Sequence, residues 1–132
     1  MRPHIDEAWR TLTLTDRDIV AFEILRDNSK AHLPTVCFHA QQATEKALKA
    51  VLFSRQIEFR RTHKLTELTK LLRDFDLIPP VSDEQFQLLT PFAVEFRYDD
   101  MKVPAITRES ATAITMTVRD WAEKRVRAVM ED

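Results

Sequence analysis

Apolar residues recur along almost the whole of this chain at the spacing of an α-helix. Five stretches carry apolar positions three and four residues apart, which places them on one face of a helix. These stretches cover about residues 5–28, 34–55, 65–75, 82–96 and 107–129. The alternating pattern of a β-strand has almost no support. The sequence therefore predicts an all-α fold.

Local signals predict where several of these helices begin and end. Pro34 opens the second helix, where a missing N–H group costs nothing, and Pro79-Pro80 ends the third. The sequence Ser82-Asp-Glu-Gln85 is a capping-box pattern that opens the fourth helix, and Thr107 caps the fifth. Thr15-Asp16 is a place where the first helix could break, with a new N-cap.

The third and fourth helices are short enough for their inward positions to be named individually. For these two helices we expect the core positions to be Leu65, Leu68, Leu72, Phe75, Phe86, Leu89, Ala93 and Phe96. Pro91 lies inside the fourth helix, which it should kink. Long helices joined by short connections favour antiparallel neighbours. We therefore expect one domain over residues 1–132, an up-and-down four-helix bundle whose extra short helix, the third, packs outside or at one end.

Composition excludes several classes of function. The chain has no glycine, so it contains no Gly-rich phosphate loop, dinucleotide fingerprint or nucleophile elbow. Lys and Arg number 20 against 21 Asp and Glu, so the basic excess of a dedicated nucleic-acid binder is absent. The single cysteine, Cys37, is expected to be a buried structural thiol in a reducing cytosol. With no apolar run of membrane-spanning length, we expect a soluble, cytoplasmic protein.

The second helix carries an organised polar face. Gln42, Glu45 and Lys49 lie together opposite the apolar face, with Lys46 beside them. One interpretation is a solvated face stiffened by the Glu45–Lys49 pair at i,i+4. The other interpretation is a functional surface. Large apolar residues lie on the polar side of the second helix, and others lie outside the core-facing stripe of the fourth helix. These apolar residues are Phe38, Phe53, Leu88 and Phe92, and a homodimer is the simplest way to cover them.

This pattern resembles a known family. The spacing Gln42-x-x-Glu45-Lys46-x-x-Lys49, followed by Thr62-His63-Lys64-Leu65, is similar to that of the HEPN domain family of nucleotidyltransferase-associated helical bundles. The resemblance extends from about Ile5 to Val129 and includes Phe96-Arg97-Tyr98-Asp99. It implies a dimeric helical bundle, often encoded beside a minimal nucleotidyltransferase, that serves as its substrate-binding or toxin–antitoxin partner.

The resemblance also bears on catalysis. Ribonuclease members of the family carry an Arg, a polar residue, three to five further residues and then a His. The Arg binds the phosphate and the His handles protons. Here Arg97 is followed by no His, because all four histidines lie at or before position 63, and Lys102 occupies the nearest allowed place. The sequence therefore favours a binding or regulatory module without catalytic residues. An active ribonuclease toxin and a purely structural dimer remain as alternatives.

The candidate ligand site follows from the same residues. We expect Arg97 and Lys49 to contact the phosphate of a nucleotide. The supporting residues would be Gln42, Glu45, Lys46, His63 and Tyr98. Arg97 has an alternative role in holding a carboxylate within the domain or dimer, and His63 has one in capping or packing at the start of the third helix. We expect no metal and no cofactor, since His39 and His63 alone do not make a zinc site.

Overall fold

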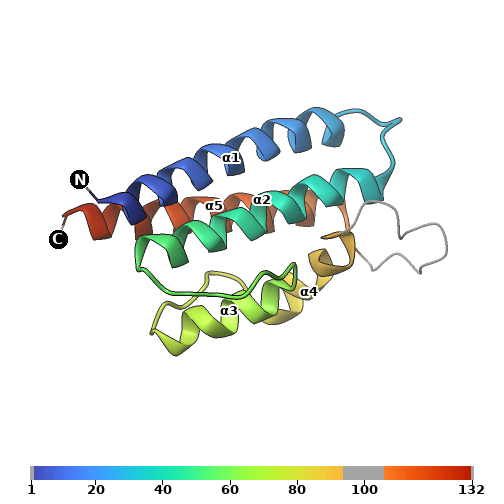
Figure 1. The fold of residues 1–132 in the computed structure, drawn as a ribbon. Helices are drawn as coiled ribbons and strands as arrows, with labels where there is room; N and C mark the ends of the chain where they lie inside the picture. Colours follow the sequence, from blue (N-terminus) through green and yellow to red (C-terminus); the bar gives the residue numbers. More distant parts are fainter. Residues whose placement is uncertain (1, 94–105, 132) are drawn as a thin grey trace.

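The protein is an all-helical bundle (Figure 1). The computed structural model describes residues 2–93 and 106–131. Its elements are α1 (Pro3–Arg26), α2 (Leu33–Ser54), α3 (Leu65–Asp74), α4 (Asp83–Leu89), the 3-10 turn η1 (Thr90–Ala93) and α5 (Arg108–Glu131). No strand occurs in these two described ranges, which confirms the predicted fold class.

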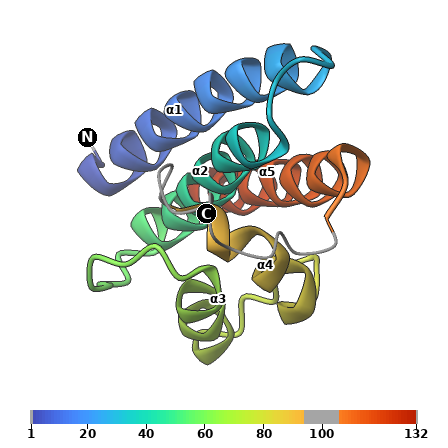
Figure 2. The ribbon, with the colours of Figure 1, turned by 90° about the vertical axis from the view of Figure 1, so that its right-hand side faces the viewer.

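Helix α2 lies at the centre of the bundle. It packs against α1 and α5 and also contacts α3, α4 and η1 (Figures 1 and 2). α1 is antiparallel to α2, as the short connection between them requires. α5 runs in the same direction as α2, because the intervening chain returns through α4 and η1 to the end at which α2 begins (Figure 1). This is the arrangement expected of the second and fourth helices of an up-and-down bundle, with α3 as the additional short helix. Both chain ends therefore lie at the same end of the bundle.

Helix α1 continues through its three threonines without the break that Thr15-Asp16 suggested. The hydroxyls of Thr11, Thr13 and Thr15 donate to the carbonyl oxygens four residues earlier, at 2.8, 3.0 and 3.0 Å. A threonine whose hydroxyl bonds to the preceding turn does not compete for the helical N–H groups ahead of it. Burial of Thr11 and Thr15 against the other helices keeps this segment helical.

Two helices end in a left-handed residue although the chain has no glycine. Gln56 after α2 and Asp76 after α3 have φ angles of 56° and 63°. The N–H of Ile57 then bonds to the Leu52 carbonyl at 3.0 Å, and Leu77 repeats this arrangement after α3 at 2.9 Å from its acceptor. Each is a Schellman motif, which satisfies carbonyls that the helix end leaves unpaired. Burial of Ile57 and Leu77 offsets the strain of a left-handed non-glycine residue.

The predicted helix starts are confirmed. Ser82 and Gln85 form the capping box of α4, with the Ser82 hydroxyl accepting from the Gln85 N–H and the Gln85 side chain accepting from the Ser82 N–H. At α5, the Thr107 hydroxyl accepts from the Ser110 N–H at 3.0 Å, and the Thr107 N–H donates to the Ser110 hydroxyl at 3.0 Å. Pro34 lies in the first turn of α2.

The fourth helix differs from its prediction. Its α-helical part ends at Leu89, and Pro91 lies in the 3-10 turn η1 and not within a kinked α-helix. Proline removes the N–H that the next α-helical turn would use, so the tighter 3-10 turn replaces it. Phe75 was expected in the core but is 56% exposed, because α3 ends at Asp74 and Phe75 is the residue that follows. Phe96 lies outside the described residues.

The core is formed by α2 and the faces that the other helices turn toward it. Phe22, Phe86 and Phe92 are the largest side chains buried completely. The expectation that Phe92 lies off the core is wrong: the change from α-helix to 3-10 turn rotates residues 90–93 relative to the helical pattern, and Phe92 is 0% exposed. Phe86 and Leu89 are buried as predicted.

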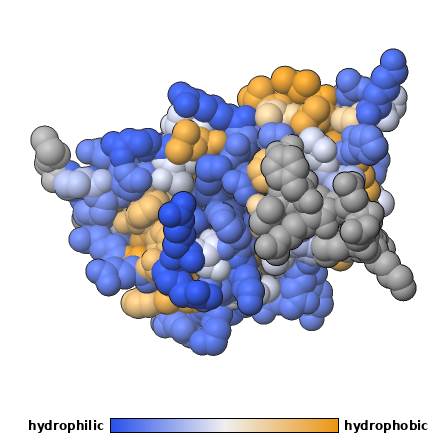
Figure 3. Space-filling view, turned by 45° about the vertical axis from the view of Figure 1, so that its right-hand side comes forward, coloured by the Kyte–Doolittle hydropathy of each residue, from blue (hydrophilic) through white to orange (hydrophobic). Residues whose placement is uncertain are grey.

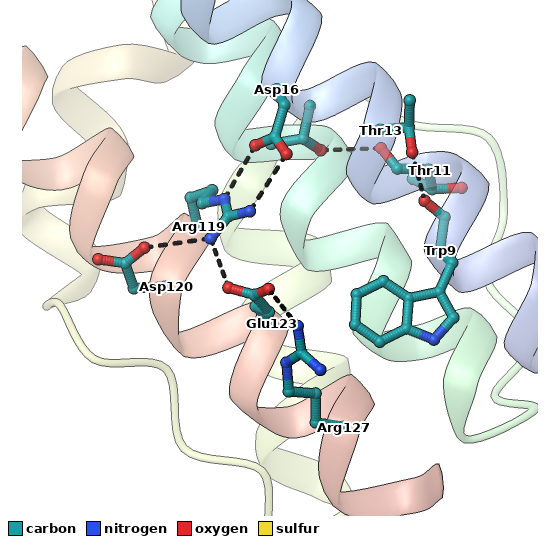
Figure 4. A network of polar contacts seen from close by, with 9 residues as sticks. Trp9, Thr11, Thr13, Asp16, Arg119, Asp120, Glu123 and Arg127 are labelled. Carbon is teal, nitrogen blue, oxygen red and sulfur yellow. Dashed lines mark hydrogen bonds and ion pairs between the residues drawn. The ribbon is translucent and has the colours of Figure 1, made fainter.

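A network of charges joins α1 to α5 (Figure 4). The Arg119 guanidinium donates to both oxygens of Asp16, at 2.9 and 3.1 Å, and to Glu123 at 2.6 Å. Hydrogen bonding to Asp16 raises the pKa of Arg119, against the lowering effect of burial. Arg127 extends the network, since it contacts Glu123 at 3.0 Å and lies over the Trp9 ring at 5.1 Å. The fork geometry of Arg119 fixes the register of α1 against α5.

The surface of the described residues is mixed. On the face drawn in Figure 3, hydrophobic residues form separate patches among hydrophilic ones. The exposed large apolar side chains are Leu14, Val20, Ile24, Phe75, Ile78 and Met130. Among the helices described, none has the length of apolar sequence that crossing a bilayer requires.

Candidate functional site

Glu45 is the centre of a polar cluster on α2. Its Oε1 accepts from the Gln41 side chain at 3.1 Å and lies 2.9 Å from Nδ1 of His63. Its Oε2 accepts from the Lys49 ammonium at 2.9 Å. The Glu45 side chain is 6% exposed, whereas His63 is 55% exposed. Because a carboxylate only accepts, the His63 Nδ1 must carry the proton in this contact.

The environment of Glu45 keeps it ionised. Burial by itself raises the pKa of this carboxyl, but the hydrogen bonds from Lys49, His63 and Gln41 lower it further than burial raises it. The net pKa of Glu45 therefore lies below its ordinary value. Each partner is a donor aimed at the charged form, which is the form that such bonds stabilise. Glu45 is consequently a fixed negative charge at neutral pH.

The sequence builds this cluster from a helix and the loop after it. Gln41, Glu45 and Lys49 are spaced at i,i+4, so they form one ridge of α2. The Schellman turn at Gln56 reverses the chain, and the following loop passes back along the same ridge. The Gln41 amide then donates to the His63 carbonyl at 3.2 Å, which joins the loop to the helix.

The structure places the residues of the predicted polar face in two different environments. The structure brings Gln42, Glu45, Lys49 and His63 together, with the Gln42 amide donating to the Gln41 side chain at 2.8 Å. Glu45 is not on a solvated face, because the 55–64 loop covers it. Lys46 points elsewhere and pairs with Asp18 of α1 at 2.6 Å.

Sequence reasoning missed Gln41, which is 0% exposed. On an amphipathic helix Gln41 lies at the boundary between the apolar and the polar face, so hydrophobic periodicity alone does not predict whether it is buried. The available signal was its spacing of four residues before Glu45, where an amide can donate to a carboxylate. Of the two structural roles considered for His63, capping of α3 is not observed, because no side chain caps that helix. The His63 ring contacts Glu45.

The remaining candidates are two ligand-site residues and four dimer-interface residues. Arg97 and Tyr98 lie outside the described residues. Among the interface candidates, Phe38 is partly buried and stands edge-on to His39, with ring centroids 5.2 Å apart. Phe53 and Leu88 are partly buried against the core. Phe92 is within the core and offers no exposed surface of its own.

Cys37 is a buried thiol, as predicted. Burial raises its pKa to about 11, against a small lowering effect of Arg108, so the thiol stays protonated at neutral pH and is a poor nucleophile. In the part of the chain that the structure describes, no group of three His, Cys, Asp or Glu side chains is placed to hold a metal ion.

An open groove of about 700 Å³ lies beside the polar cluster. Its walls come from the end of α2, the loop that follows and the first turn of α1. Its lining residues are His4, Lys49, Phe53, Gln56, Ile57, Glu58, Phe59 and Arg61. Lys49 belongs to both features, because its ammonium also lies 5.9 Å from the centroid of the Phe59 ring. The groove therefore joins a fixed ion pair to an aromatic wall.

The all-helical fold agrees with the comparison to known families. A sequence profile of the HEPN domain matches residues 16–128. The chain belongs to the HEPN domain family. The match includes α2, the loop carrying His63 and most of α5, so the polar cluster lies within the HEPN domain. No curated protein and no solved structure gives a significant match.

Proposed function

We propose that this HEPN protein is a non-catalytic binding and regulatory module, working as a homodimer and as the nucleotide-binding partner of a minimal nucleotidyltransferase. The absence of a histidine after Arg97 is the observation that carries the non-catalytic part. Ribonuclease members of the family need that imidazole to move protons, and a lysine or arginine is a poor substitute near neutral pH.

The polar cluster supports the same conclusion. A general base should have a pKa near the working pH, but the pKa of Glu45 is lowered and both of its oxygens already accept hydrogen bonds. His63 is held against the same carboxylate. Glu45 is therefore suited to holding shape and charge and not to transferring protons.

The ribonuclease alternative can be tested with RNA. We expect the purified protein to leave mixed cellular RNA intact, with the wild type and Arg97→Ala giving the same background. Separation of the RNA on a denaturing gel over time is the measurement. RNA cleavage that disappears in Arg97→Ala would overturn the non-catalytic proposal and favour a toxin that uses Arg97 with another base such as Lys102.

Nucleotide binding can be tested by thermal unfolding. A ligand that binds the folded state alone raises the unfolding temperature as its concentration rises. We expect at least one of ATP, GTP, AMP and GMP to do so, while inorganic sulfate at equal ionic strength does not. A flat response to all four nucleotides would favour the purely structural dimer.

A further inference from the structure

We propose that the groove beside Lys49 binds a mononucleotide, with the base against Phe59 and Phe53 and the phosphate at Arg61. This inference rests on the proposed function, to which it adds a place on the protein and the residues that contact the base and the phosphate. The volume of about 700 Å³ is in the range of small-molecule sites. The groove combines aromatic surface with cationic groups, the two features that a nucleotide requires.

The aromatic part of the groove comes from two rings of different segments. Phe53 lies on α2 and Phe59 on the following loop, with centroids 5.3 Å apart and planes at 61°. Both are partly buried against the core, which holds them in place while part of each ring remains accessible. The rings stand edge to face, so one of them can offer its face to a base. A ring held in this way can stack a nucleobase of any identity.

The phosphate contact in the groove depends on which of its cationic side chains is not already paired with a carboxylate. Lys49 is paired with Glu45 at 2.9 Å, so its charge is largely compensated. Arg61 is exposed and makes no ion pair with the described residues. Its planar guanidinium is suited to two hydrogen bonds with a phosphate. His4, in the first turn of α1, adds a ring nitrogen to the lining, and Glu58 is the one carboxylate there.

A neighbouring groove on the other side of Phe59 lacks these properties. It has a volume of about 420 Å³ and contains three carboxylates, Glu58, Glu67 and Asp74. Its cations are already paired, since Arg60 contacts Glu67, and Lys70 lies 3.7 Å from Asp74. An anionic ligand would have to displace these pairs, so the groove beside Lys49 is the better phosphate site.

The test compares AMP with adenosine by isothermal titration calorimetry on the full chain. Arg61→Gln should weaken AMP binding about tenfold and leave adenosine unchanged, because it removes a charge-assisted contact to the phosphate alone. Phe59→Leu keeps the apolar volume but removes the ring, and should weaken both ligands about tenfold. The matched control is Arg55→Gln, an exposed arginine on the same segment that does not line the groove and should change neither affinity.

The outcomes separate this inference from the proposed function. If the wild type binds AMP but Arg61→Gln and Phe59→Leu bind it equally well, the groove is not the site, and nucleotide binding itself stands. If the wild type binds neither AMP nor GMP, the mononucleotide assignment fails, and if it binds none of ATP, GTP, AMP and GMP, the proposed function fails with it. A short oligoribonucleotide that binds more tightly than AMP, through the same two residues, would overturn the assignment to a free nucleotide. Unchanged thermal unfolding of Arg61→Gln, an exposed position, shows that its effect is on binding.

Discussion

Replacing Phe92 by alanine is expected to lower the unfolding free energy by about 3–5 kcal/mol, the usual cost of removing a completely buried phenylalanine. The loss combines the transfer of the ring from the core with the cavity it leaves. A residue at a dimer interface would behave differently, because its removal would change the monomer–dimer equilibrium while the monomer stayed folded. Urea denaturation followed by circular dichroism measures the first effect, and light scattering measures the second.

Phe75→Ala is the matched control for Phe92→Ala. Phe75 is 56% exposed, so its removal should change the unfolding free energy by no more than about 0.5 kcal/mol. The amphipathic pattern assigned the two phenylalanines the opposite roles, with Phe75 in the core and Phe92 outside it. A Phe92→Ala protein that unfolds like the wild type but has lost its dimer would show that the burial of this ring has been misjudged.

Replacing Glu45 by glutamine is expected to cost about 2–3 kcal/mol of unfolding free energy at neutral pH. Removing one partner of a buried ion pair leaves the other charge uncompensated. The cost falls below that of a fully buried pair, because Lys49 is 18% and His63 is 55% exposed, so water can partly solvate them. The glutamine NH₂ would also face the Lys49 and His63 donors. Glu7→Gln, in an exposed pair with Arg10, is the control that should change stability little.

The pH dependence of the Glu45 effect provides a second test. The pKa of Glu45 is lower in the folded chain than its ordinary value of 4.5, so between the two values the unfolded chain binds more protons. Stability from this carboxylate is therefore present above about pH 4.5 and is lost as the pH falls through the folded-state pKa. Urea denaturation of the wild type and of Glu45→Gln, at neutral pH and at about pH 3.5, should show a smaller difference in unfolding free energy between the two proteins in acid. A difference in unfolding free energy that stays constant or grows in acid would contradict the ion-pair explanation.

The sequence predicted the helices well because their signals are local. Helical periodicity, the Ser82–Gln85 capping box and the Thr107 cap depend on residues within one or two turns of each other, so no knowledge of distant contacts is needed. The ends of α2 and α3 were harder to predict. Without glycine, nothing in the composition marks Gln56 or Asp76 as left-handed, and each adopts that conformation because the next residue is buried.

The sequence indicated which residues belong to the candidate site, but not how they are buried or which contacts they make. The residues Glu45, Lys49 and His63 were selected from the spacing on one helix and a short following motif. Whether Glu45 faces water or a loop depends on the path of residues 55–64, which no helical period describes. For the same reason the roles of Gln41 and Arg61 came from the structure, one as a buried donor and the other as an exposed arginine beside an aromatic wall.

By itself the sequence determined the helical class, the HEPN resemblance and the absence of a histidine after Arg97, because each is a property of residue types at short spacing. The tertiary structure alone decided that Phe92 is in the core, that Glu45 is buried and that a groove opens beside Lys49. Burial is a relation between segments that are distant along the chain. Helix α2 packs against α1 and α5, and the 55–64 loop covers its polar ridge, so Gln41 and Glu45 are buried as well. A single amphipathic pattern describes one buried face and cannot describe a helix that is covered on several sides.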